Sequence, residues 1–90
     1  MLLYLAEFIG TFVFVSVILL NSNNALAIAA ALFVAIHLAT NVQGAGAFNP
    51  AVTLVQYFNK SISQFELAGG IAAQVLGAAA AFYYHKQLKQ

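Results

Sequence analysis

Apolar stretches alternate with brief polar turns along the chain, and this pattern gives the first prediction of its structure. Three of the stretches are close to the roughly 20 residues that a helix needs to cross a bilayer. They cover residues 3–20, 25–42 and 65–84. A shorter stretch covers residues 50–58, between the second and third long ones. The pattern predicts an all-α membrane protein with three transmembrane helices and one short additional helix.

The composition agrees with lipid as the surroundings of most side chains. Of the 90 residues, 63% are hydrophobic and 6% are charged, whereas soluble proteins carry far more charge on their surfaces. A net charge of +1 argues against binding to nucleic acid, and the lack of cysteine excludes disulfides and thiolate metal sites. We expect an integral, multi-pass membrane protein with no enzyme activity, cofactor or metal. Since Glu7 interrupts the first apolar stretch and no basic segment precedes it, we expect no cleaved signal peptide.

Residues 43–58 predict a re-entrant loop followed by a half-length helix. The loop is rich in glycine and alanine, and it is too short and too apolar for an ordinary aqueous connection. Asn49 is a favourable N-cap and Pro50 suits the first helical position, so a helix begins there. It runs to about Phe58, which gives a length of roughly 13 Å, or about half a membrane. A polar turn at residues 59–63 then returns the chain to the surface that it left, and the two termini lie on opposite sides.

The start of this short helix is the candidate site. A helix N-terminus inside a membrane carries unpaired N–H groups and a partial positive charge, which is costly unless a polar group faces it. We expect water or a solute to face it, with the Asn49 amide in direct contact and Pro50 and Ala51 at the helix start. The preceding loop would offer a ladder of carbonyl acceptors from Gly44, Ala45, Gly46 and Ala47. The alternative is that Asn49 only caps the helix.

Three segments of the chain carry a family resemblance. They are residues 6–12 (Ala-Glu-Phe-Ile-Gly-Thr-Phe), residues 44–54 with Asn-Pro-Ala, and residues 71–77 (Ile-Ala-Ala-Gln-Val-Leu-Gly). In this order they resemble the N-terminal half of an aquaporin, of the major intrinsic protein family. The resemblance implies a passive channel for water and small neutral solutes such as glycerol, urea or ammonia. Family members join two inverted halves in one polypeptide, and residues 1–90 correspond to a single half-aquaporin domain.

The second half of the pore is then expected from another chain. An identical copy inserted upside down would supply it, as an antiparallel homodimer within the membrane lipid. The charges allow both orientations, because Lys60 lies on one side and Lys86 and Lys89 lie on the other. By family analogy, four such pores make an assembly of eight chains. The alternative supplier is a different half-channel protein.

Two further features concern the frame of the site. The resemblance implies that Glu7 braces the re-entrant loop, with Gln74 beside it; the alternatives are a proton-coupled exporter that uses Glu7, and a non-conducting membrane scaffold. Small residues recur every four positions in the third stretch, which predicts close helix packing or, alternatively, unspecific filler. These residues are Gly69, Ala73, Gly77 and Ala81.

The resemblance also implies which residues form the narrowest part of the pore. They are His37, Val52, Gly46 and Ala29. Water-selective members have an aromatic residue where Ala29 stands and an arginine where Val52 stands. The constriction is therefore expected to be wider and less charged than in those members, so that glycerol or urea can pass beside water. The alternative for His37 is a hydrogen bond within the helix bundle.

Overall fold

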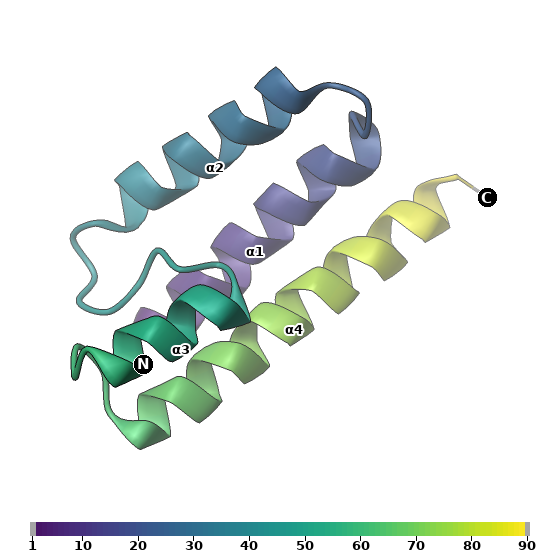
Figure 1. Cartoon of the computed structure of the whole chain (residues 1–90). Coiled ribbons are helices and arrows are strands. Elements are labelled where there is room, and N and C mark those ends of the chain that lie inside the picture. Colours follow the sequence, from purple (N-terminus) through teal and green to yellow (C-terminus); the bar gives the residue numbers. More distant parts are fainter. Residues whose placement is uncertain (1, 90) are drawn as a thin grey trace.

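The computed structural model describes residues 2–89 as four helices joined by short loops (Figure 1). The helices are α1 (Leu2–Leu20), α2 (Ala25–Ala39), α3 (Pro50–Phe58) and α4 (Gln64–Leu88). Residues 2–89 contain no strand, so the prediction of an all-helical protein is confirmed for them.

Two of the helices are long and apolar enough to cross a membrane. α1 has 19 residues with a mean hydropathy of 2.2, and α4 has 25 residues with a mean hydropathy of 1.5. α2 has 15 residues, about 22 Å, and is a shorter apolar helix. These lengths support a membrane protein, with α1 and α4 as its candidate spans.

The bounds of α2 and α4 differ from the predicted spans for local reasons. α2 ends at Ala39 instead of Val42, because the Thr40 hydroxyl donates a hydrogen bond to the His37 carbonyl and closes the last turn. α4 continues to Leu88 instead of Tyr84, since the polar residues that follow Tyr84 are themselves good helix formers.

α1 and α4 pack closely through small residues. A Cβ atom added at Gly77 would lie 2.5 Å from the Phe8 carbonyl oxygen, so the two backbones touch there. A Cβ at Gly69 would lie 2.5 Å from the Tyr4 ring. Ala73 and Ala81, at the same four-residue spacing, are buried. The row therefore lies where α4 meets α1, as close helix packing requires.

The segment after α2 turns back into the molecule. In Figure 1 the loop of residues 40–49 leaves one end of the bundle and runs inward, and α3 then returns toward that same end. α3 packs on α4, with Thr53 buried against the Gly70 position. The start of α3 therefore lies away from the ends of the bundle, which places Asn49 for the site described next.

Candidate functional site

The start of α3 is built by its cap. The Asn49 side-chain oxygen Oδ1 accepts a hydrogen bond of 2.8 Å from the Ala51 N–H, and Pro50 has no N–H to satisfy. The Asn49 carbonyl accepts bonds from both the N–H and the hydroxyl of Thr53. Asn49 is exposed, and its Nδ2 amide has no hydrogen bond to any residue between 2 and 89. The cap thus leaves a neutral two-proton donor pointing away from the helix.

A buried carboxylate holds the loop that leads to this cap. Glu7 is 1% exposed, and its Oε2 accepts a hydrogen bond of 2.7 Å from the Gly46 N–H. Its Oε1 accepts bonds from the Phe48 N–H at 2.9 Å and from Gln74 Nε2 at 2.7 Å. Burying a carboxylate is costly unless it is hydrogen-bonded, and bonds to a charged acceptor are the strong ones. The three donors therefore fix the loop to α1 and, through Gln74, to α4.

Gln74 joins this carboxylate to the short helix. Its Nε2 also donates a bond of 2.7 Å to the Thr53 hydroxyl, which in turn donates to the Asn49 carbonyl. The Gln74 amide thus turns its nitrogen toward both the Glu7 carboxyl group and the Thr53 hydroxyl. The chain Glu7–Gln74–Thr53–Asn49 thus connects α1, α4 and α3 in one buried network. Among residues 2–89, two buried side-chain oxygens in or near this network have no hydrogen-bond partner. They are Gln74 Oε1, within the network, and Thr11 Oγ1, four residues after Glu7 on α1.

Thr53 is a site residue that the sequence reasoning missed. It is 2% exposed and is the polar side chain of α3 that faces α4. The signal was available: a threonine four residues after an Asn cap can bond the cap's carbonyl, and it lies on the side of α3 opposite exposed Val52 and Val55.

The loop itself depends on two left-handed glycines. Gly44 has a φ of 82° and Gly46 a φ of 105°, values that other residues rarely adopt. The Gly46 N–H donates a hydrogen bond to Glu7. The next residue, Ala47, is buried, with 7% of its surface exposed. The hydrogen bonds found in this loop involve its N–H groups and do not test the carbonyl groups of residues 44–47. The predicted ladder of carbonyl acceptors therefore stays a prediction.

The four residues expected at the constriction lie on three different elements. Ala29 and His37 are exposed on α2, Val52 is exposed on α3, and Gly46 is half-buried in the loop. The His37 ring stacks on Phe33, with ring centroids 6.3 Å apart. Ala29 and His37 are eight residues apart on one helix, which separates them by about 12 Å along its axis. One chain therefore does not bring both to the same narrow ring.

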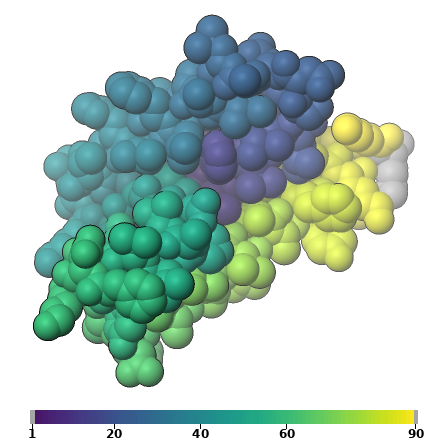
Figure 2. Space-filling model, viewed as in Figure 1, coloured from purple at the N-terminus to yellow at the C-terminus, as the bar shows by residue number. Residues whose placement is uncertain are grey.

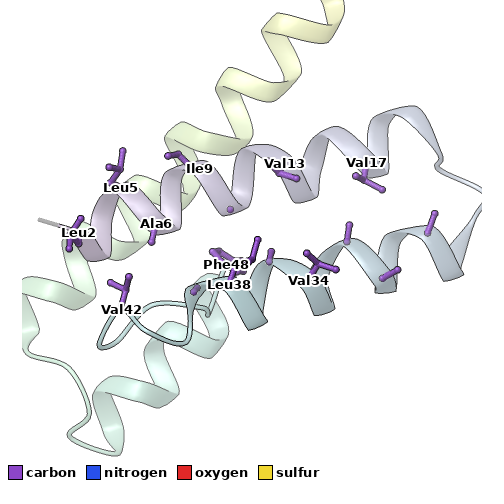
Figure 3. A pocket seen from close by; sticks show the side chains of 16 residues that line it. Leu2, Leu5, Ala6, Ile9, Val13, Val17, Val34, Leu38, Val42 and Phe48 are labelled. Carbon is purple, nitrogen blue, oxygen red and sulfur yellow. The ribbon is translucent and has the colours of Figure 1, made fainter.

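An apolar groove of about 710 Å³ lies between α1 and α2 (Figure 3). In the space-filling view, α1 is visible at its floor, between α2 and α3 (Figure 2). Phe48 enters the groove from the loop and lies beside Leu38. Neither His37 nor Ala29 lines it. All its lining side chains are apolar, so it offers packing surface and no hydrogen-bonding group.

Comparison with known proteins gives one informative match. The chain is 38% identical over 82 residues to "Glycerol uptake facilitator protein-like 6" of Lactiplantibacillus plantarum (strain ATCC BAA-793 / NCIMB 8826 / WCFS1). The match covers 83% of this chain, and the chain spans 38% of the length of that relative. No protein-family model and no solved structure matches the chain. This similarity agrees with the resemblance of the sequence to the major intrinsic protein family.

Proposed function

We propose that this chain belongs to the major intrinsic protein family and forms one half of a passive channel for small neutral solutes. Glycerol is the first candidate solute, because the relative is named for its uptake, and water is the second. The observation that carries the proposal is the exposed side-chain amide of Asn49, a residue whose backbone carbonyl is fixed by a network that ends on buried Glu7.

The chemistry of this position suits an uncharged solute with hydroxyl groups. The Asn49 Nδ2 and the Val52 N–H have no hydrogen-bond partner among residues 2–89, so both can donate to a solute oxygen. The partial positive charge of the helix start opposes cations and orients a hydroxyl or water with its oxygen inward. Val52 itself is exposed beside these donors and offers an apolar surface to the carbon atoms of a polyol.

A pore needs a second wall opposite this one. Residues 1–90 contain a single Asn-Pro-Ala segment, and we propose that a second unit supplies the opposite wall. We propose a second, inverted copy, since Ala29 of one copy and His37 of the other can then meet at one mouth, with Gly46 and Val52 completing the constriction. By family analogy, four such pairs would associate as eight chains. A different half-channel protein is the alternative supplier.

Two other functions receive less support. A proton-coupled exporter would need Glu7 to gain and lose a proton, yet its two oxygens accept three N–H donors and it is 1% exposed. Protonation would turn a donor toward those donors, which favours a structural role. A non-conducting scaffold would not need the exposed amide of Asn49.

Flux through reconstituted vesicles tests the channel. Vesicles carrying the protein should take up glycerol down its gradient, without a pH gradient and faster than empty vesicles. Asn49→Ala should slow this flux about tenfold, because an unmade polar contact costs on the order of 1–3 kcal/mol. Leu54→Ala, an exposed apolar change on the same helix, is the control. Glycerol flux that equals that of empty vesicles would refute the channel, and equal flux in Asn49→Ala would remove Asn49 from the pathway.

The orientation of the copies tests the inverted pair. A reporter that is active on one side only, fused to the C-terminus, should reveal both orientations in comparable amounts, since the Lys residues at the two ends nearly balance. A conducting protein with one fixed orientation and no other polypeptide present would exclude the inverted pair.

A further inference from the structure

Phe48 is held in an unfavourable backbone conformation directly before the site. Its φ is 52°, in the left-handed region where bulky residues are rare. Such a conformation is costly for a residue other than glycine and persists only where its surroundings impose it. Phe48 is 5% exposed and is held at two points: its N–H bonds Glu7 Oε1, and its ring lies on α1.

The seat of the Phe48 ring is made by Gly10. A Cβ atom added at Gly10 would lie 2.9 Å from the Cδ1 atom of the ring and closer still to Cε1 and Cζ. Real Cβ atoms do not approach other atoms so closely, so any larger residue at position 10 must displace the ring. Gly10 is thus the position of α1 that admits Phe48 between α1 and α2 (Figure 3).

Among residues 2–89, no residue outside α3 forms a hydrogen bond with the Asn49 side chain. Its single side-chain bond goes to Ala51 of the same helix, so its direction depends on how the chain enters α3. From the α3 side, Thr53 fixes the Asn49 carbonyl. From the loop side, the residue that fixes the approach of the chain is Phe48.

We propose that Phe48, seated on Gly10, is a positioning residue that sets the direction of the Asn49 amide and thereby the preference of the channel among solutes. This rests on the proposed channel function. Phe48 itself does not touch the solute in this account; it acts through Asn49. If Phe48 only filled the groove, changes at its seat would alter stability and leave the solute preference unchanged.

The test is the ratio of glycerol flux to water flux in vesicles carrying Gly10→Ala. The added methyl group moves the ring, and with it the left-handed backbone before Asn49. We expect the ratio to change by about threefold or more, which corresponds to about 0.7 kcal/mol between the two barriers. Restoring space with Phe48→Leu in the Gly10→Ala protein should move the ratio back toward that of the original.

Gly69→Ala is the matched control. It is the same substitution in a membrane helix, and it also forces an aromatic ring, that of Tyr4, to move. Tyr4 and Gly69 lie near the starts of α1 and α4 and take no part in the Glu7–Asn49 network. The flux ratio should therefore stay that of the original protein, whatever happens to the stability.

Each outcome decides the proposal. A Gly10→Ala ratio that shifts no more than the Gly69→Ala ratio, with flux retained, overturns the positioning role and leaves the channel intact. Absence of glycerol and water flux in the original protein overturns the channel instead. If Gly10→Ala does not assemble, Phe48→Gly replaces it, because glycine adopts the left-handed backbone freely and removes only the ring. An unchanged ratio in that variant also overturns the proposal.

Discussion

The two faces of α1 differ in how they are packed, and the buried face carries the polar residues Glu7 and Thr11 within an apolar helix. On one face Leu3, Glu7 and Thr11 are buried, against α4 and the re-entrant loop. On the other face Leu5 and Ile9, which are 53% and 50% exposed, line the open groove beside α2. Hydropathy does not predict which leucine of α1 is buried, Leu3 or Leu5, since lipid satisfies an apolar side chain as well as a protein neighbour does.

The difference comes from glycine and from one aromatic ring. Gly77 lets the backbone of α4 touch that of α1 at Phe8, so this interface closes. On the other side the Phe48 ring lies at Gly10 between α1 and α2, and the groove stays open around it. The closed face therefore holds α1 against α4 and contains the polar network, while the open face leaves apolar side chains exposed.

The largest expected effect on this comparison comes from Glu7 on the closed face. Glu7→Ala removes the acceptor of three hydrogen bonds, which leaves the Gly46 N–H, the Phe48 N–H and one hydrogen of the Gln74 amide without an acceptor. At about 1–3 kcal/mol for each orphaned group, we expect a loss of at least about 3 kcal/mol, enough to unfold the loop. Thermal unfolding in detergent measures this loss.

Glu7→Gln refines the same test. It keeps the size of the side chain and one acceptor oxygen, so its cost should lie between those of the original and Glu7→Ala. Passive glycerol flux that survives in Glu7→Gln would agree with a bracing role. Transport that depends on a pH gradient and is lost in Glu7→Gln would instead favour the exporter.

A smaller effect is expected from a matched pair of glycines on α4. Gly77→Ala brings a methyl group within 2.5 Å of the Phe8 carbonyl, where the backbone cannot yield, and should destabilise the protein by about 1–3 kcal/mol. Gly70→Ala meets its nearest atom, a Thr53 methyl carbon, at an ordinary 3.6 Å. It should be neutral or stabilising by up to about 1 kcal/mol, from helix propensity alone. Equal unfolding temperatures for the two variants would show that backbone contact does not close this face.

The sequence predicts the helices well and their contacts unevenly. The start of α3 lies at Pro50 because Asn and Pro have strong local preferences. Glu7 and Gln74 are 67 residues apart and form a hydrogen bond in the structure. Local sequence patterns do not predict a contact over such a separation, and the resemblance to a known family indicated it. The end of α2 could not be placed by hydropathy, since the hydroxyl of Thr40 decides it. The roles of Phe48 and Gly10 arise from the way the loop folds back, which no local pattern contains.

The smallest expected effect is that of Leu5→Ala, and its contrast with Leu3→Ala separates the two faces most directly. Leu3 and Leu5 are two residues apart on α1, and Leu3 is 7% exposed whereas Leu5 is 53% exposed. Leu3→Ala should destabilise the protein by about 2 kcal/mol or more, since it leaves a cavity against the loop. Leu5→Ala removes the same atoms from the groove face, where detergent or lipid replaces them, so its cost should stay below about 0.5 kcal/mol.

Unfolding of both variants, at the same detergent concentration, measures this difference. A Leu5→Ala protein as unstable as Leu3→Ala would mean that the groove is covered in the folded assembly. In that case the loss should shrink on dilution, because the covering surface belongs to another molecule and both proteins lose it as the assembly dissociates. A loss that does not depend on concentration would instead mean that α1 and α2 pack more closely in solution, and the contrast between the two faces of α1 would be wrong.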